Sequence, residues 1–200
     1  MKKFALKSPA LALLLITILF PASVPAVSAE PVGTISAVEG RVGMLKSGNN
    51  EFSDVKPGDS VCAGDTLRTK SGSKAEIAFA DKTIVRLSDS TFLEIKDYVI
   101  GPNGNRSGAG LFLSRGKIRA IVSKSGNGSF LVTTPNALGS VKGTDIVAVY
   151  QRSSTSLAVL DGKLSAANAY APGNTVDIKS GQSSIISGES EPTVPRALLS

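Results

Sequence analysis

The sequence has no histidine, no tryptophan and a single cysteine. Histidine is the commonest general base and the commonest metal ligand in proteins. Its absence excludes a Ser–His–Asp or Cys–His catalytic group, and with one cysteine it also excludes a structural zinc site. We therefore predict no catalytic residue, no metal and no cofactor, and a protein that is not an enzyme.

Carboxylates are the catalytic alternative that this composition leaves open. Asp59 and Asp65 each follow a glycine, and Asp81 comes later in the chain. A paired-carboxylate hydrolase needs one acid desolvated beside another, whereas an aspartate after a turn glycine caps its own backbone. We favour turn capping, and we keep a hydrolase of envelope polymers acting through Asp59, Asp65 and Asp81 as an alternative.

The lone cysteine, Cys62, cannot form an internal disulfide. Free cysteines in proteins are usually small buried side chains, and this one stands between Val61 and Ala63. We predict burial, with a reactive thiol or an intermolecular bridge as the alternative.

Long apolar runs are also scarce, and the one that exists lies near the start. Three lysines precede the apolar residues Ala10–Phe20, and the small residues Val27–Ala29 follow. The run is shorter than the roughly 20 residues that a membrane-spanning helix needs. This order of segments predicts a signal peptide over residues 1–29. We expect cleavage after Ala29, a periplasmic or secreted protein, and no stable membrane insertion afterwards; an uncleaved anchor is the alternative.

Charge of one sign is not concentrated anywhere in the chain. The 22 basic and 16 acidic residues give a formal net charge of +6, and removal of the three lysines of residues 1–29 leaves 19 basic residues and +3. The charges are scattered, without a run of five like residues. Nucleic-acid binding needs clustered phosphate contacts, so we expect no nucleic-acid partner.

The apolar pattern after residue 30 has a period of two, which is typical of strands. The alternating segments are Ala75–Phe79, Val85–Leu87, Leu93–Ile95 and Leu157–Val159. Ile146–Tyr150 is apolar on both faces, which predicts a strand between two layers. Asn103-Gly104, Asn127-Gly128 and Asp161-Gly162 are tight-turn dipeptides. The sequence predicts an all-β fold of short strands.

We expect one domain over residues 30–187 and a flexible C-terminal tail over residues 188–200. Residues 101–110, rich in Gly, Asn and Ser, are predicted to form a flexible surface loop. A small unit of a polar or charged residue, glycine, a base and an aliphatic residue occurs at Glu39–Val42, Arg115–Ile118 and Asp161–Leu164. We interpret these units as hairpin-like starts.

Pro57–Thr69 contains two Gly-Asp pairs followed by Thr, an aliphatic residue, any residue and Thr, and it resembles the signature of the FecR domain. Further segments resemble elements of that domain in the same order, over roughly residues 33–187: Gly33–Gly43, Ser73–Leu87, Leu113–Ile118, Phe130–Pro135, Val141–Ile146, Val159–Leu164 and Ile178–Gln182. The residues that carry the resemblance are those to which we assign structural roles: Gly58, Asp59, Gly64, Asp65, Thr69, Gly116, Thr134, Pro135, Gly143, Thr144 and Gly162.

The resemblance implies a β-solenoid-like or sandwich-like domain in the envelope of a Gram-negative-type bacterium. Well-known FecR regulators sense an outer-membrane siderophore transporter, and carry a cytoplasmic anti-sigma segment and a transmembrane helix before this domain. Here a signal-like segment stands in that place, so we expect a stand-alone, secreted FecR-domain protein.

Two functions are compatible with these expectations. The first is an exported, non-catalytic module that binds a protein or glycan partner of the envelope along a sheet edge or face. The alternative is an accessory regulator of cell-surface signalling of the sigma/anti-sigma, iron-transport type.

Overall fold

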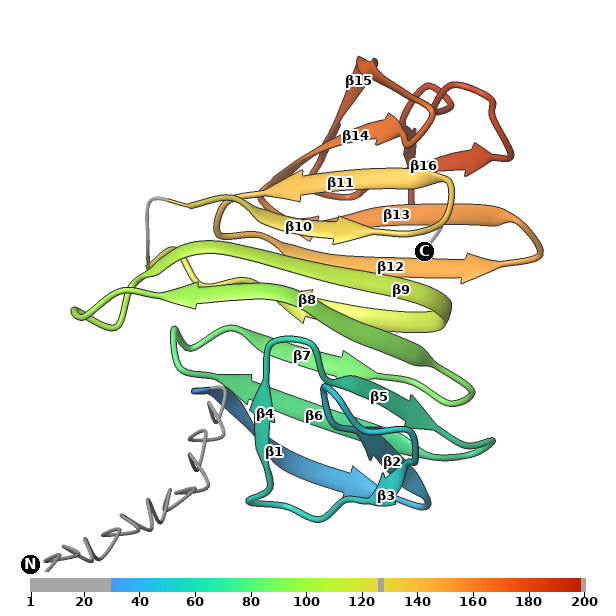
Figure 1. Cartoon of the computed structure of the whole chain (residues 1–200). Coiled ribbons are helices and arrows are strands. Elements are labelled where there is room, and N and C mark those ends of the chain that lie inside the picture. The colour runs from blue at the N-terminus through green and yellow to red at the C-terminus, as the bar shows by residue number, and fades with distance from the viewer. Residues whose placement is uncertain (1–29, 126–127, 199–200) are drawn as a thin grey trace, which may run out of the picture.

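The computed structural model describes residues 30–125 and 128–198, and the regular elements in these ranges are strands (Figure 1). The predicted all-β fold class is confirmed. The predicted signal peptide, residues 1–29, lies outside the described residues, so its cleavage stays a prediction. The described ranges contain no helix that is long and apolar enough to span a membrane.

The strands form two sheets that share one strand, β9 (Arg106–Ile121). Sheet A contains, in spatial order, β4 (Ser60–Cys62), β1 (Pro31–Glu39), β6 (Lys74–Phe79), β7 (Ile84–Leu87), the second part of β9, β12 (Asp145–Gln151), β13 (Ser154–Asp161), β16 (Gln182–Ser187) and β17 (Arg196–Ala197). Sheet B contains β3 (Ser53–Asp54), β2 (Val42–Leu45), β5 (Thr66–Thr69), β8 (Phe92–Ile100), the first part of β9, β10 (Phe130–Thr133), β11 (Ala137–Val141), β14 (Lys163–Asn168) and β15 (Ala171–Lys179). Neighbouring strands are antiparallel, except that β10 runs parallel to β9.

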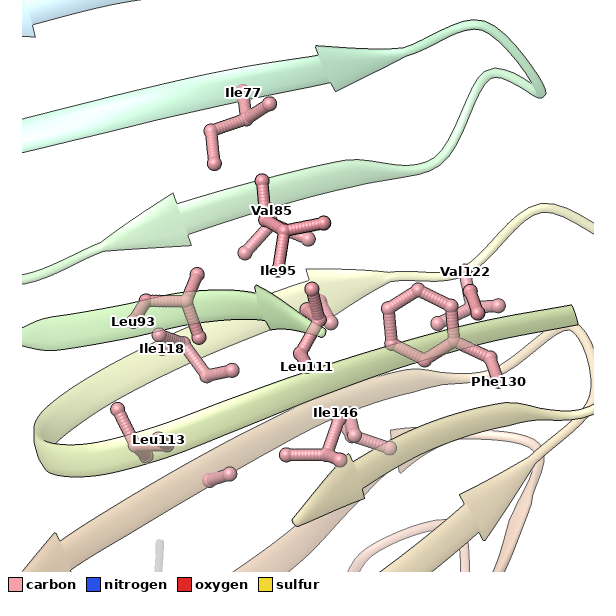
Figure 2. Packing of buried hydrophobic residues seen from close by; sticks show 14 of the residues in the cluster. Ile77, Val85, Leu93, Ile95, Leu111, Leu113, Ile118, Val122, Phe130 and Ile146 are labelled. Atoms are coloured by element: carbon pink, nitrogen blue, oxygen red, sulfur yellow. The ribbon is translucent and has the colours of Figure 1, made fainter. Parts of the chain in front are cut away.

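A single apolar core lies between the two sheets. Figure 2 shows side chains of both sheets meeting there: Ile77, Val85, Ile118 and Ile146 from sheet A, and Leu93, Ile95, Leu111, Leu113 and Phe130 from sheet B, all fully buried. Burying each such side chain stabilises the fold by about 1.5–3 kcal/mol. The two sheets therefore depend on each other for their main source of stability.

The predicted alternation is confirmed in β6, β7, β8 and β13, whose larger apolar side chains face the core. The expectation for Ile146–Tyr150 is wrong. Ile146 and Ala148 are buried in the core and Tyr150 packs against it, while Val147 and Val149 lie half-buried on the outer face of sheet A. A sheet of this sandwich has one covered face, so a strand that is apolar on both sides leaves aliphatic groups at the surface.

We expected the repeated glycine-base unit to start hairpins, and this expectation is wrong. The unit instead moves the chain from one sheet to the other. At Gly40 the chain passes from β1 to β2, at Gly116 it changes sheet within β9, and at Gly162 it passes from β13 to β14. All three glycines have a positive φ, of 75°, 98° and 96°. That conformation strains residues with a Cβ, which explains the glycine.

Residues 101–110 are not one loop. The turn ends at Asn105, and β9 begins at the buried Arg106 and pairs with β8. Glycine content alone therefore places the end of the loop too late, inside β9.

The segment after Gly188 returns along the last strands of sheet A. The Thr193 amide donates to the Ile185 carbonyl over 2.9 Å, and β17 pairs with β16. Of the three turn dipeptides predicted from the sequence, Asn127-Gly128 begins outside the described residues. The glycines of the other two, Gly104 and Gly162, have the positive φ expected of turns. The mobility of residues 188–200 and the boundaries of the single domain stay predictions.

Replacing Gly116 with alanine should destabilise the fold more than replacing Gly58 with alanine. The two glycines have nearly the same φ, 98° and 95°, but a Cβ at Gly116 would clash with Thr91, at 2.6 Å from its Cα, while a Cβ at Gly58 has nothing within 4 Å. Backbone strain should cost each variant about 1–3 kcal/mol, and the clash should add about 1–3 kcal/mol at Gly116. Urea unfolding measures both free energies; equal losses would show that the Gly116 corner is not closely packed.

Candidate functional site

The two Gly-Asp pairs close two turns of the same kind. The Asp59 carboxylate accepts a hydrogen bond from the Lys56 amide over 2.9 Å, and the Asp65 carboxylate accepts one from the Cys62 amide over 2.8 Å. The glycine before each aspartate has a positive φ, as the third residue of a type II turn requires. Both aspartates thus hold the backbone of their own turns.

Asp65 also binds a second segment of the chain. It is buried, and its carboxylate accepts from the Ser47 amide over 3.0 Å and from the Lys46 ammonium over 2.9 Å. These contacts fix the loop after β2 against the turn before β5. Cys62, which we predicted to be buried, is half-buried in β4.

The remaining residues of the family resemblance also lie at turns and corners. Thr69 Oγ1 accepts from the Thr91 amide over 2.9 Å and donates to the Ser88 carbonyl over 2.6 Å. Thr134, followed by Pro135, accepts from the Ala137 amide over 3.0 Å in the turn between β10 and β11. The structure therefore spreads these residues over many turns, and it does not bring them together in one site.

Gly143 and Thr144 form the passage from β11 to β12. Gly143 has a φ of 62°, and Thr144 Oγ1 donates to the Lys163 carbonyl over 3.0 Å beside the corner at Gly162. The same pairing of a hydroxyl with a corner occurs twice more. Ser73 Oγ accepts from the Arg41 amide over 2.9 Å, and Thr91 Oγ1 accepts from the Lys117 amide over 3.1 Å.

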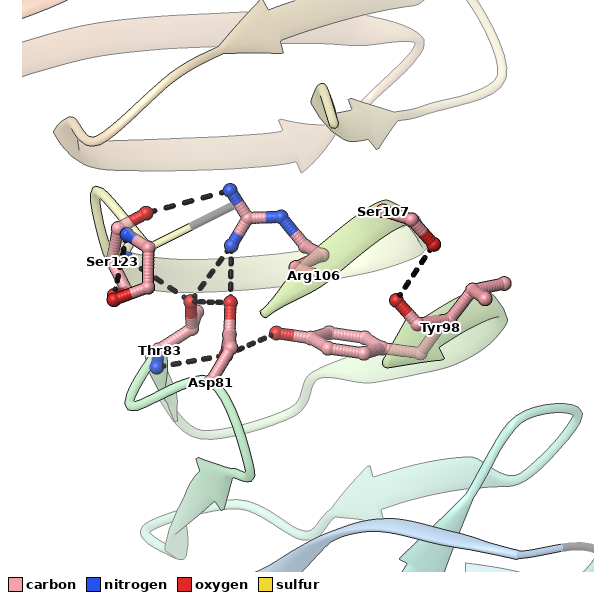
Figure 3. A network of polar contacts seen from close by, with 8 residues as sticks. Asp81, Thr83, Tyr98, Arg106, Ser107 and Ser123 are labelled. Carbon is pink, nitrogen blue, oxygen red and sulfur yellow. Dashed lines mark hydrogen bonds and ion pairs between the residues drawn. The ribbon is translucent and has the colours of Figure 1, made fainter. Parts of the chain in front are cut away.

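Asp81 sits at the centre of a buried polar network (Figure 3). One carboxylate oxygen accepts from the Thr83 amide over 3.0 Å and from the Tyr98 hydroxyl over 2.8 Å. The other accepts from the Thr83 hydroxyl over 2.9 Å and from the guanidinium of Arg106. The Arg106 guanidinium also lies 5.4 Å from the Phe130 ring centre.

Four donors occupy the Asp81 carboxylate, which leaves its charge compensated inside the protein. Burial raises the pKa of Tyr98 well above its usual range, so this hydroxyl stays a donor at ordinary pH. Such a network stabilises one arrangement of β6, β8 and β9 and does not leave an acid free to transfer protons. Within the described residues, no three His, Cys, Asp or Glu side chains are grouped so that they could hold a metal ion.

Sequence reasoning considered Asp81 only as a candidate acid and missed Arg106. The signal is weak, because Arg106 stands in a segment of Gly, Asn and Ser that is typical of a loop. Its partner lies 25 positions earlier in the chain. Asp81 lies in the turn between β6 and β7 of sheet A, and Arg106 lies at the start of β9 in sheet B, so the two charges meet only when the two sheets pack together.

The candidate binding site is a hollow on the outer face of sheet A, with a volume of about 670 Å³. We call it the sheet A hollow. Strands β1, β6, β7, β9, β12 and β13 contribute to it. Its aliphatic floor includes Ala37, Val147 and Leu160, and Leu160 is 41% exposed.

Charged side chains around the sheet A hollow are mostly fixed by ion pairs. Arg86 donates to Glu76 over 2.6 Å, and Arg119 donates to both oxygens of Asp145, over 3.0 and 2.6 Å. Hydrogen bonds from Arg86, and then from Ser36, hold the pKa of Glu76 below its usual range. Lys117 also lines the hollow, and none of the ion pairs found in the described residues includes it. The site is thus aliphatic at its base with pre-positioned polar groups around it.

Removing one partner of the buried pair should be costly. Arg106→Met leaves the Asp81 charge buried without its cation, and we expect a loss of about 3–5 kcal/mol in the free energy of unfolding. The double variant Asp81→Asn/Arg106→Met should lose less than the sum of the two single variants. The control is Arg115→Met, which removes an exposed arginine. Urea unfolding measures all four; a loss for Arg106→Met no larger than for the control contradicts the role of the pair.

Two crystal structures of a proposed anti-sigma factor from Parabacteroides distasonis are similar to this chain, with TM-scores of 0.55 and 0.54 and 15% sequence identity. Each match covers 66% of this chain and 59% of the other, so this chain spans about three-fifths of the length of those structures. At this identity the likeness shows the fold alone. No protein of curated function matches the chain.

The family comparison is more specific. The model of the family described as FecR protein matches residues 65–165, half of the 200-residue chain. The match begins at the second Gly-Asp pair and ends just after the corner at Gly162, within the wider resemblance over residues 33–187. It includes Asp65, Thr69, Gly116, Thr134 and Thr144, whose backbone contacts shape the corners described above. The chain belongs to the FecR family.

Proposed function

We propose that this protein is an exported, non-catalytic FecR-domain module that binds a protein partner in the bacterial envelope, and that the partner docks on the sheet A hollow. The observation that carries the proposal is the composition of the hollow. Aliphatic side chains form its base, and arginines held in place by carboxylates surround it.

This composition is typical of a protein interface. The centres of such interfaces are enriched in apolar residues and arginine, and a side chain that is already fixed loses less entropy when a partner binds. Arg86 and Arg119 are fixed in this way, whereas Lys117 is available for an acidic group of the partner. A protein partner is therefore favoured over a glycan at this site.

The polar networks support a non-catalytic role. Asp65 and Asp81 are both buried and both bound by several donors from the protein itself. Asp59 caps its own turn. A hydrolase would need one of these carboxylates to face a substrate, so the carboxylate-dependent alternative has little support.

A regulatory role in cell-surface signalling is the second candidate. It is favoured by the similarity of the fold to structures described as a proposed anti-sigma factor. If this role is correct, deletion of the gene changes the transcription of a sigma-factor regulon. If transcription is unchanged in the deletion strain and the wild-type protein still forms a complex with its partner, only the binding role remains.

Leu160→Glu should abolish partner binding at the sheet A hollow, because it places a charge on the aliphatic base. A matched control is Leu131→Glu on the outer face of sheet B, since Leu131 and Leu160 are 40% and 41% exposed. The partner is first identified by photo-crosslinking from position 37 and is then purified. We expect Leu160→Glu to weaken its binding at least about tenfold and Leu131→Glu to leave it unchanged; equal effects would rule out this docking site.

The proposed export is checked in the same cells. The protein should be recovered from the periplasm or the medium with Glu30 as its first residue, measured by mass spectrometry of the intact chain. Recovery of the full-length chain in the cytoplasm would contradict export.

A further inference from the structure

A second surface lies on the outer face of sheet B, away from the sheet A hollow. Phe52, Arg68, Phe92 and Arg115 alternate there, and we call them the Phe–Arg ladder. The Arg68 guanidinium lies 4.2 Å from the centre of the Phe52 ring and 5.8 Å from that of Phe92. The Arg115 guanidinium lies 4.8 Å from the centre of the Phe92 ring.

The strand register builds this surface. Arg68 in β5 pairs with Phe92 in β8, and Phe92 pairs with Arg115 in β9. Neighbouring strands are about 4.8 Å apart, so the backbones that carry the two arginines are about 10 Å apart. Phe52 precedes β3 and packs over Gly43, which has no side chain to block it. Three of the four side chains are thus carried by paired strands.

Neither arginine of the ladder is compensated by a carboxylate. None of the ion pairs found in the described residues includes Arg68 or Arg115. The nearest acid along β8, Glu94, pairs with Lys96 over 2.9 Å. The Nε of Arg68 is moreover buried without a hydrogen-bond partner. Two like charges therefore lie on one face without an ion-pair partner among the described residues.

Cation–π contacts hold each guanidinium against a phenylalanine ring on the outer face of sheet B. That geometry suits a carboxylate, which a guanidinium binds through two parallel hydrogen bonds. The arginines also cover faces of the Phe52 and Phe92 rings. Sugar rings bind aromatic side chains by stacking on such faces, so an acidic glycan would find little of its usual contact here. The half-buried phenylalanines instead leave apolar area that a side chain of a protein could cover.

We propose that the Phe–Arg ladder binds an acidic segment of a protein, with carboxylates of that segment taken up by Arg68 and Arg115 and an apolar side chain against the phenylalanines. An extended chain advances about 3.3–3.6 Å per residue, so carboxylates two to four residues apart can reach both arginines. This surface is independent of the sheet A hollow, and either proposal can fail without the other.

The test uses the processed protein and a fluorescent peptide in which glutamate alternates with glycine and leucine. Arg115→Gln should weaken binding about tenfold, the loss expected for a hydrogen bond to a charged group, and Arg115→Lys should restore only part of it. The control is Lys179→Gln, which removes an exposed cation from the far strand of the same sheet and should leave affinity unchanged. Raising the salt concentration should weaken binding of the wild-type protein.

Amide chemical shifts of the labelled protein locate the peptide. We expect changes in β5, β8 and the first part of β9, and none on the outer face of sheet A. Equal binding of a peptide with glutamine in place of glutamate, an equal loss for Lys179→Gln, or tighter binding of an oligoglucuronate than of the peptide would each overturn the proposal. Thermal unfolding of Arg115→Gln is measured alongside, and Arg68→Gln provides a second variant at the other end of the ladder.

Discussion

Where the chain passes between the sheets at Gly40, Gly116 and Gly162, the backbone of the next residue must find a hydrogen-bond partner outside the strand ladders. The protein meets this constraint with a glycine that turns the chain and a hydroxyl from a neighbouring turn that binds the next residue. Ser73, Thr91 and Thr144 supply these hydroxyls at three corners. Unsatisfied buried polar groups cost about 1–3 kcal/mol each, so these contacts are a condition for bringing the two sheets together over one core.

The local pattern was sufficient to predict the strands but not their assembly. The alternation in segments such as Ala75–Phe79 follows from one buried face, and it predicts β6 directly. The glycine-base unit is equally visible in the sequence, but a hairpin and a sheet-to-sheet corner need the same residue types. Only pairing across the whole chain distinguishes the two, and that information is not local.

The sites were harder to predict for the same reason. The capping aspartates could be predicted because a turn glycine and its aspartate are adjacent, and Asp59 and Asp65 cap as expected. Arg106 could not, because its partner Asp81 lies in a distant turn of the other sheet. The sheet A hollow depends on Val147 and Leu160, and the Phe–Arg ladder depends on the register of β5, β8 and β9. A strand that is apolar on both faces, such as Ile146–Tyr150, is the best sequence signal for an exposed apolar surface, because the sandwich covers only one face of each sheet.

The strand shared by both sheets has a consequence for how the two outer surfaces relate. Arg115 belongs to the Phe–Arg ladder and Lys117 lines the sheet A hollow, and only Gly116 separates them. Because β9 carries both residues on one continuous backbone, a change in the backbone at Gly116 would alter the surfaces on both outer faces of the sandwich at once.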